Sequence, residues 1–269
     1  MFNNTIIING LANKGFKNVT AKKITKNGVK LNAFIYTVDN IGVTVYTDGC
    51  KTNDDVINRC ADAFSRPIPE IDNPLKNFDK SKLNARIYAR GKSGSDIARP
   101  FLNLEIVPCY DVIIDEINGE GGQIKLNHAT ASTITNMDVN DLIDTAIKNA
   151  FTQVTVNHIA DMLSRMSGQP REAFEGVPMW VISNTHKTYG AVNLANTVEL
   201  GNLADKLNED IYVLPSSLHE LIAVPVSLGE PSMFLEMVRE INATEVKAEE
   251  KLSDSVYIYS RKNNTVTLA

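Results

Sequence analysis

The chain has 269 residues, of which 43% are hydrophobic and 22% charged, a balance that allows a folded protein with a sizeable core. Its 27 basic and 32 acidic side chains give a formal charge of -5, and no cluster of four or more Lys or Arg stands out. Nucleic acid is therefore not an expected partner. Composition alone does not define what the protein does.

The cysteines and the apolar runs bear on the compartment. Cys50, Cys60 and Cys109 are an odd number in a chain too long to need disulfides, and no signal-peptide pattern stands at the start. Apolar runs such as 221–226 are far shorter than the roughly 20 residues that span a bilayer. These features predict a cytoplasmic protein without a membrane span.

Alternating apolar and polar residues dominate the first third of the chain. The run 29–36 and the run 43–46 predict strands of an antiparallel meander over 18–47, and Asn27-Gly28 is a tight-turn signal. A helix is expected from an N-cap at Asn53, whereas the isoleucines in 5–8 are typical of a strand.

The middle third predicts further strands at 83–89, 102–114 and 123–134, the last two joined as a hairpin by the glycines of 119–122. Asp138 is the expected N-cap of a helix that reaches 150. A second apolar stripe at helical spacing, with core character, is formed by Ile159, Met162, Leu163 and Met166.

The last third mixes both element types. We expect strands at 179–183, 211–214, 221–226 and 256–259, and helices at 194–207 and 233–241, the second with Ser232 as its N-cap. The predicted fold class is α+β, with antiparallel sheets and flanking helices in two packed halves, 1–166 and 177–269. The polar stretch 167–176 is the expected linker, and a single compact domain is the alternative.

Three C-terminal segments carry a resemblance to a known family. They are IYVLPSSLHELIAVP at 211–225, MWVISNTHKTYGA at 179–191 and EEKLSDSVYIYSR at 249–261. Together they resemble an uncharacterised domain-of-unknown-function family of bacteria and their mobile elements, whose members share a YVLPSSxHExxxVP segment. The resemblance implies an accessory protein of a phage, plasmid or conjugative element, and an amphipathic N-terminal helix that the strand-like run 5–8 does not match.

The densest polar group is the loop 215–220, which holds Ser216, Ser217, His219 and Glu220. A Ser-His mechanism needs the imidazole within hydrogen-bond reach of the hydroxyl, which neighbours on one turn rarely achieve. The alternative is that the serines cap the turn while His219 or Glu220 bonds a neighbouring strand. A zinc-protease HExxH motif is excluded, because position 223 is Ala.

A second polar loop follows the strand at 179–183 and contains Asn184, His186, Lys187 and Tyr189. If its strand neighbours the strand at 221–226, the two loops converge. Their side chains could then offer donors to an anionic or nucleotide-like ligand, against the alternative of a plain polar turn.

Other motifs predict no chemistry. The run 91–96 lacks the preceding glycine of a phosphate loop and is interpreted as a flexible hairpin turn. His128, expected on a strand, and His158, expected on a helix, have no partner at ligand spacing, so neither a metal nor a cofactor is predicted.

Three functional hypotheses remain. The first is a non-catalytic accessory protein of a mobile element that binds a host or element-encoded protein. The second is a small-molecule or nucleotide binder, or a hydrolase, that uses the loops 184–189 and 216–220. The third is a self-assembling phage protein or other homo-oligomer, paired through an exposed strand edge such as 5–8.

Overall fold

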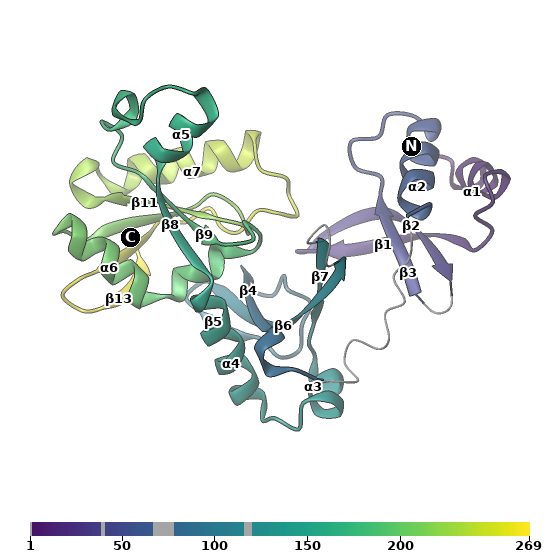
Figure 1. The fold of residues 1–269 in the computed structure, drawn as a ribbon, viewed down its shortest axis with the longest axis horizontal. Coiled ribbons are helices and arrows are strands. Elements are labelled where there is room, and N and C mark those ends of the chain that lie inside the picture. The colour runs from purple at the N-terminus through teal and green to yellow at the C-terminus, as the bar shows by residue number, and fades with distance from the viewer. Residues whose placement is uncertain (1, 39–40, 67–77, 116–119) are drawn as a thin grey trace. The chain divides into compact units, whose positions relative to one another are not determined.

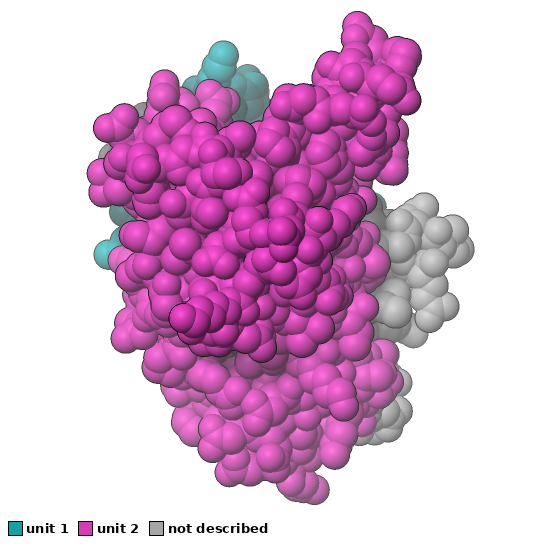
Figure 2. All heavy atoms as spheres, turned by 90° about the vertical axis from the view of Figure 1, so that its left-hand side faces the viewer, with its two compact units in different colours: residues 1–73 teal, residues 74–269 magenta. Residues whose placement is uncertain are grey.

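The computed structural model describes residues 2–38, 41–66, 78–115 and 120–269 (Figure 1). The chain divides into two compact units, Met1–Asn73 (unit 1) and Pro74–Ala269 (unit 2), which are coloured separately in Figure 2. The linker expected at 167–176 lies inside unit 2. The fold class is α+β with antiparallel sheets, as predicted.

Unit 1 is a three-stranded antiparallel sheet with two helices. Its elements are α1 (Asn4–Asn13), β1 (Val19–Lys26), β2 (Val29–Val38), β3 (Ile41–Tyr46) and α2 (Asn53–Phe64), and the strand order is β1-β2-β3. The predicted meander is therefore confirmed. Phe34 of β2 packs with Val56 and Cys60 of α2 to form the core of this unit.

The run 5–8 is helical, and the prediction of a strand there is wrong. The Asn3 side chain accepts hydrogen bonds from the amides of Thr5 and Ile6, at 3.1 and 3.2 Å, and so caps α1. Ile7 and Leu11 are fully buried one turn apart, so burial of one helix face outweighs the strand propensity of the isoleucines.

In unit 2, a first sheet is built around one long strand. We call it the middle sheet: β4 (Leu83–Ala89), β5 (Arg99–Phe101), β6 (Leu104–Asp115) and β7 (Glu120–Lys125). β4 pairs along one edge of β6, and β5 and β7 pair along the other. The hairpin of β6 and β7 is confirmed, although part of its glycine turn lies outside the described residues.

The middle sheet has one apolar and one polar face. Ala85, Ile87 and Tyr110 belong to the core that also holds Leu142 and Ala146 of α4 (Val139–Thr152), and Asp138 caps α4 as predicted. Because directly paired residues point to the same side, the opposite face carries a set of mainly polar side chains. They are Asn84, Arg86, Tyr88, Glu105, Asp111, Gln123 and Lys125, together with the buried Val107 and Cys109.

The segment after β7 differs from the predicted strand at 123–134. The strand ends at Lys125, and α3 (His128–Ile134) follows, so His128 begins a helix. The Asn127 side chain accepts from the Thr130 amide at 2.9 Å, while the Thr130 hydroxyl accepts from the Asn127 amide at 2.8 Å. This reciprocal cap favours a helix despite the β-branched residues of 130–134.

The second sheet of unit 2, here the large sheet, has the strand order β13-β12-β10-β11-β9-β8. Its strands are β8 (Val154–His158), β9 (Trp180–Asn184), β10 (Ile211–Pro215), β11 (Leu221–Pro225), β12 (Tyr257–Ser260) and β13 (Thr265–Leu268). β8 and β13 were not predicted. Since β8 pairs with β9, this sheet takes strands from both sides of the expected linker.

Both faces of the large sheet are covered. On one face, α6 (Thr197–Leu207) and the 3-10 turn η3 (Gly190–Ala195) join the core of the middle sheet. On the other, Phe234 and Val238 of α7 (Pro231–Thr244) pack on Tyr212 and Val224. In Figure 1, α7 lies above β11 and α6 lies below it. Within the described ranges, no helix has the length and apolar character of a membrane span.

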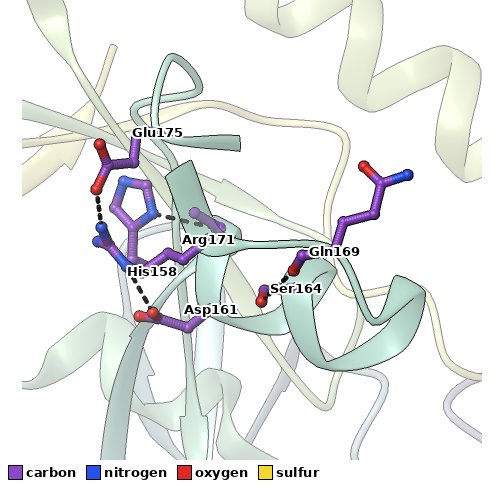
Figure 3. A network of polar contacts seen from close by, with 7 residues as sticks. His158, Asp161, Ser164, Gln169, Arg171 and Glu175 are labelled. Atoms are coloured by element: carbon purple, nitrogen blue, oxygen red, sulfur yellow. Dashed lines mark hydrogen bonds and ion pairs between the residues drawn. The ribbon is translucent and has the colours of Figure 1, made fainter. Parts of the chain in front are cut away.

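The expected linker is a folded excursion around α5 (Ile159–Ser167), shown in Figure 3. Arg171 of the 3-10 turn η2 (Arg171–Phe174) bonds Asp161 at 2.7 Å and also Glu175, and the Ser164 hydroxyl donates to the Gln169 carbonyl at 2.7 Å. The predicted core stripe on this helix is wrong, because only Ala160 is buried and Met166 is 83% exposed.

The C-terminal part of unit 2 is tied to the middle sheet through Asn103, which lies between β5 and β6. Its amide nitrogen donates to the hydroxyls of Ser253 and Ser255, at 3.3 and 3.1 Å, and its amide oxygen accepts from the Tyr257 hydroxyl at 2.8 Å. This contact joins residues that are about 150 positions apart in the chain.

Candidate functional site

The two polar loops singled out in the sequence lie next to each other. β9 and β11 pair antiparallel, with Leu221 opposite Ile182, so the loop after β9 and the loop before β11 leave the sheet at the same edge. We call residues 183–190 together with 216–220 the loop junction. The convergence predicted for these loops is therefore present.

Backbone hydrogen bonds hold the junction closed. The amide of Gly190 donates to the His219 carbonyl at 3.0 Å, and the Ser183 hydroxyl donates to the same oxygen at 2.8 Å. A Cβ atom at position 190 would lie 2.6 Å from the Ser183 Cα, so only glycine fits between the loops. The approach is close enough to exclude any side chain there.

The His219 imidazole joins three segments. Its Nδ1 accepts from the Tyr189 amide at 3.2 Å, and its Nε2 lies 4.0 Å from a carboxylate oxygen of Glu250. Because Nδ1 acts as an acceptor here, the proton of the neutral ring is on Nε2, toward Glu250. The Glu250 carbonyl accepts from the Leu218 amide at 2.8 Å and fixes the third segment.

The serines of the 216–220 loop take part in the turn itself. The Ser217 hydroxyl accepts from the His219 amide at 3.0 Å, and the Ser216 hydroxyl lies 3.5 Å from the Glu220 carboxylate. His219 therefore bonds Ser217 through its backbone, while its ring is directed at Tyr189 and Glu250. This geometry favours the capping role that the sequence left open over a Ser-His pair.

The 184–189 loop is shaped by one buried amide. The Asn184 side chain donates to the Thr188 carbonyl at 2.7 Å and accepts from the Thr188 amide at 3.1 Å. Lys187 and Tyr189 have φ values of 55° and 56°, a left-handed conformation that is uncommon outside glycine. His186 and Lys187 are exposed at the loop tip, so they do not join the contacts around His219.

Arg86 of β4 completes the site and was not singled out in the sequence. Its guanidinium lies 3.4 Å from the centroid of the Tyr189 ring, and that ring contacts the His219 ring at a tilt of 58°, with 5.1 Å between the ring centroids. The guanidinium also bonds the Gln123 side chain and, at 3.4 Å, the Tyr88 hydroxyl. The alternating pattern of the β4 sequence predicts that Arg86 lies on a polar face. No sequence signal, however, indicates its contact with the 184–189 loop, about a hundred residues later.

The charge of Arg86 is not matched by a direct ion pair. Within the described part of the chain, no carboxylate forms a salt bridge with its guanidinium. Asp111 is linked to Arg86 indirectly: Gln123 accepts from the guanidinium and donates to the Asp111 carboxylate. Asp111 also accepts from Asn84 at 2.8 Å. Burial raises the pKa of the Tyr88 hydroxyl more than the neighbouring Arg86 cation lowers it, so this hydroxyl remains a hydrogen-bond donor.

The loop 91–96 is ordered by a carboxylate of the protein. Glu105 accepts from the amides of Gly91 and Ser93, both at 2.8 Å. Burial by itself would raise the pKa of Glu105, but the bonds from Ser93 and Gly91 outweigh it and lower that pKa. The prediction of a flexible hairpin turn is wrong, because β4 and β5 do not pair with each other but each pair with β6. The Glu105 carboxylate also occupies the amides that would otherwise bind a phosphate.

No metal centre is found among the residues that the structure describes: no group of three or more His, Cys, Asp or Glu is arranged to hold an ion. His158 ends β8 and caps α5, its Nδ1 accepting from the Ala160 amide at 3.1 Å (Figure 3). Its ring meets the edge of buried Trp180 at 4.9 Å. This histidine therefore shapes the start of the α5 excursion.

Comparison with known proteins adds a family. Residues 96–261 match DUF5688, a family of unknown function. The chain belongs to this family. No curated protein and no solved structure matches the chain. The family match includes both loops of the junction, Glu250 and α7, whereas unit 1 and Arg86 lie before it.

Proposed function

We propose that the protein binds a small anionic molecule, of the carboxylate or phosphate type, at the loop junction, with Arg86 as the recognising cation. The observation that carries this proposal is the stacking of the Arg86 guanidinium on Tyr189 without a carboxylate partner among the described residues. A partly buried cation is normally paired, and a guanidinium presents a planar set of donors that suits carboxylates and phosphates.

The surroundings of Arg86 support a binding role. Tyr88 and Gln123 occupy part of its donor set and fix the plane of the guanidinium, so that little side-chain entropy is lost when an anion binds. Tyr189 fixes the same plane from one side and is itself held by the His219 contact. The rigid junction would thus act as the support of the site, with the exposed Lys187 as a further cation at the loop tip.

A hydrolase at this site has less support. The His219 ring is directed to the Tyr189 amide and to Glu250, and the Ser217 hydroxyl accepts a backbone amide. A serine nucleophile requires a base within hydrogen-bond reach of its hydroxyl. The His219 imidazole is instead directed at the Tyr189 amide and Glu250. We therefore propose binding without covalent catalysis.

Isothermal titration calorimetry with inorganic phosphate, citrate and AMP tests this proposal. We expect one of these probes to bind, and Arg86→Gln to weaken it at least tenfold, since it removes the charge and the fork of donors. Arg86→Lys should bind with intermediate affinity because it keeps only the charge. Arg90→Gln, at an exposed arginine after the same strand, is the matched control and should bind as the wild type does. Equal affinity of Arg86→Gln and wild type would refute the role of Arg86.

A second candidate function is that of an accessory protein that binds a host or element-encoded protein. The bacterial mobile-element setting is supported by the resemblance in the 211–225 segment. Protein binding is supported by three apolar residues of α7 that are exposed, Met233, Met237 and Ile241. The third hypothesis, a self-assembling phage protein or other homo-oligomer, stays a prediction, but the run 5–8 offers no strand edge for it because that run is helical.

A further inference from the structure

One flank of α7, beside its buried side, carries apolar residues that remain exposed in the part of the chain that the structure describes. Phe234, Val238 and Asn242 recur every four residues and form its buried side. Met233, Met237 and Ile241 recur with the same spacing, one position before each of them, and are 45%, 37% and 39% exposed. We call these three residues the α7 stripe.

Exposed apolar residues are concentrated here. Among the described residues, nine large hydrophobic side chains are exposed, and four of them fall within 228–241, namely the α7 stripe and Leu228 at 41%. Singly scattered apolar residues are normal on a protein surface, but a contiguous group marks an interaction site. The stripe is therefore a candidate docking surface.

An acidic row runs beside the stripe. Glu236 and Glu240 stand three residues after Met233 and Met237, so they lie next to the stripe on the outer side of the helix. Both are exposed, and neither forms an ion pair with any residue in the described ranges. Arg239, the basic residue of this helix, lies on the opposite flank by helical spacing.

The stripe sits on a fixed element. The Asn242 side chain, buried beneath the helix, donates to the Ser253 carbonyl at 2.9 Å and to the Asp254 carboxylate at 2.8 Å. Phe234 and Val238 are held in the core over the large sheet. A partner would therefore meet a preformed surface, which lowers the entropy cost of binding.

We infer that the α7 stripe docks a basic amphipathic helix of a partner protein. Met233 and Ile241 are eight residues apart, about 12 Å along the helix, which matches roughly two turns of a partner. Apolar residues of that helix would cover the stripe, and Lys or Arg beside them would face Glu236 and Glu240. Methionines suit such a surface because they adapt to different apolar partners.

Charge argues against two other occupants. An anionic membrane would be repelled by the acidic row. A second copy that paired through the same stripe would bring Glu236 and Glu240 of both copies together, which costs energy for like charges. This inference is independent of the anion site, because the α7 stripe contains none of the residues of the loop junction.

The test uses the full chain and a fluorescent 18-residue peptide of Leu and Lys with apolar residues at helical spacing. We expect saturable binding by fluorescence anisotropy. The variant Met233→Ser, Met237→Ser, Ile241→Ser should lose at least tenfold in affinity, as should Glu236→Lys, Glu240→Lys. The matched control is Val198→Ser, at a 69% exposed apolar residue of α6, which should bind the peptide as the wild type does.

Three results would overturn the inference. Equal binding of a Leu and Glu peptide with the same pattern would show that charge does not select the partner. Equal binding of a scrambled Leu and Lys peptide would show that no helix face is recognised. A homodimer in light scattering that the triple serine variant dissociates would identify a second copy as the occupant. The charge-reversal variant leaves the apolar contacts intact, so it remains informative if the triple variant does not fold.

Discussion

Replacing Gly190 by alanine would place a methyl group where the backbone of β9 already lies. The added Cβ would be 2.6 Å from both the Ser183 Cα and the Ser183 hydroxyl oxygen, and 2.7 Å from the Asn184 nitrogen. Neither backbone atom can rotate away as the end of a long side chain would. The two loops must therefore move apart to accept the variant.

The cost follows from the overlap and from the bonds that the movement strains. Forcing an extra methyl into a closely packed site costs about 1–3 kcal/mol. The bonds from the Gly190 amide and the Ser183 hydroxyl to the His219 carbonyl would weaken, and each contributes about 0.5–1.5 kcal/mol. We expect a total loss of roughly 2–4 kcal/mol, equivalent to about 4–16 °C in the melting temperature of a domain of this size.

Thermal and urea unfolding followed by Trp180 fluorescence would measure this loss, because Trp180 is the one tryptophan of the sequence and begins β9. Gly176→Ala is the matched control: a Cβ there has no atom within 4 Å, so its stability should be unchanged or slightly higher. If Gly190→Ala unfolds at the same urea concentration as Gly176→Ala, the close approach of the two loops is not the feature that we describe.

Two further predictions concern buried groups of the protein. Glu105→Gln should lose about 1–3 kcal/mol at pH 7, because the amides of Gly91 and Ser93 lose their charged acceptor. The pKa of Glu105 is lower in the folded protein than in the unfolded chain, where it is about 4.3. The extra stability of the wild type over Glu105→Gln is therefore present above about pH 4.3 and is lost as the pH falls through the folded pKa. If urea titrations at pH 7 and below pH 4 give the same difference in unfolding free energy between the two proteins, this reasoning is contradicted. Burial raises the pKa of Cys60 and of Cys109 to about 11, so at pH 8 a thiol reagent should modify Cys50 quickly in the native protein and the other two only after denaturation. Fast modification of all three thiols without denaturant would argue against the burial of Cys60 and Cys109.

Local signals predicted most elements of unit 2 well. The strand runs at 211–214 and 221–226 correspond to β10 and β11, and Asp138 caps α4 as the sequence indicated. Where predictions were wrong, a cap or a tertiary contact outweighed residue propensity. Asn3 starts a helix through isoleucines, and the Asn127 and Thr130 pair starts one through β-branched residues. For α7, Ser232 was expected to cap the helix, but Pro231 already occupies its first turn.

The sequence predicted the two loops of the candidate site but not the role of its cation, Arg86. Residues 184–189 and 216–220 stand beside strong strand patterns, so their meeting needed only that these strands be neighbours. Arg86 reaches Tyr189 only because of how the middle sheet packs against that loop. The periodic pattern of one strand does not predict such packing. The roles of Asn184 and Ser217 as supports of the backbone likewise follow from their three-dimensional partners.

The bonds of Asn103 to Ser253, Ser255 and Tyr257 have a consequence for the order of folding during synthesis. β12, which contains Tyr257, is an interior strand of the large sheet, between β10 and β13. Until residues 253–260 have left the ribosome, Asn103 has none of these partners and β10 has a bare edge. Closing a loop of about 150 residues is slow compared with forming local contacts. Unit 2 therefore reaches its final packing only after residues 253–260 have been made, whereas the buried core residues of unit 1 all lie within 7–64.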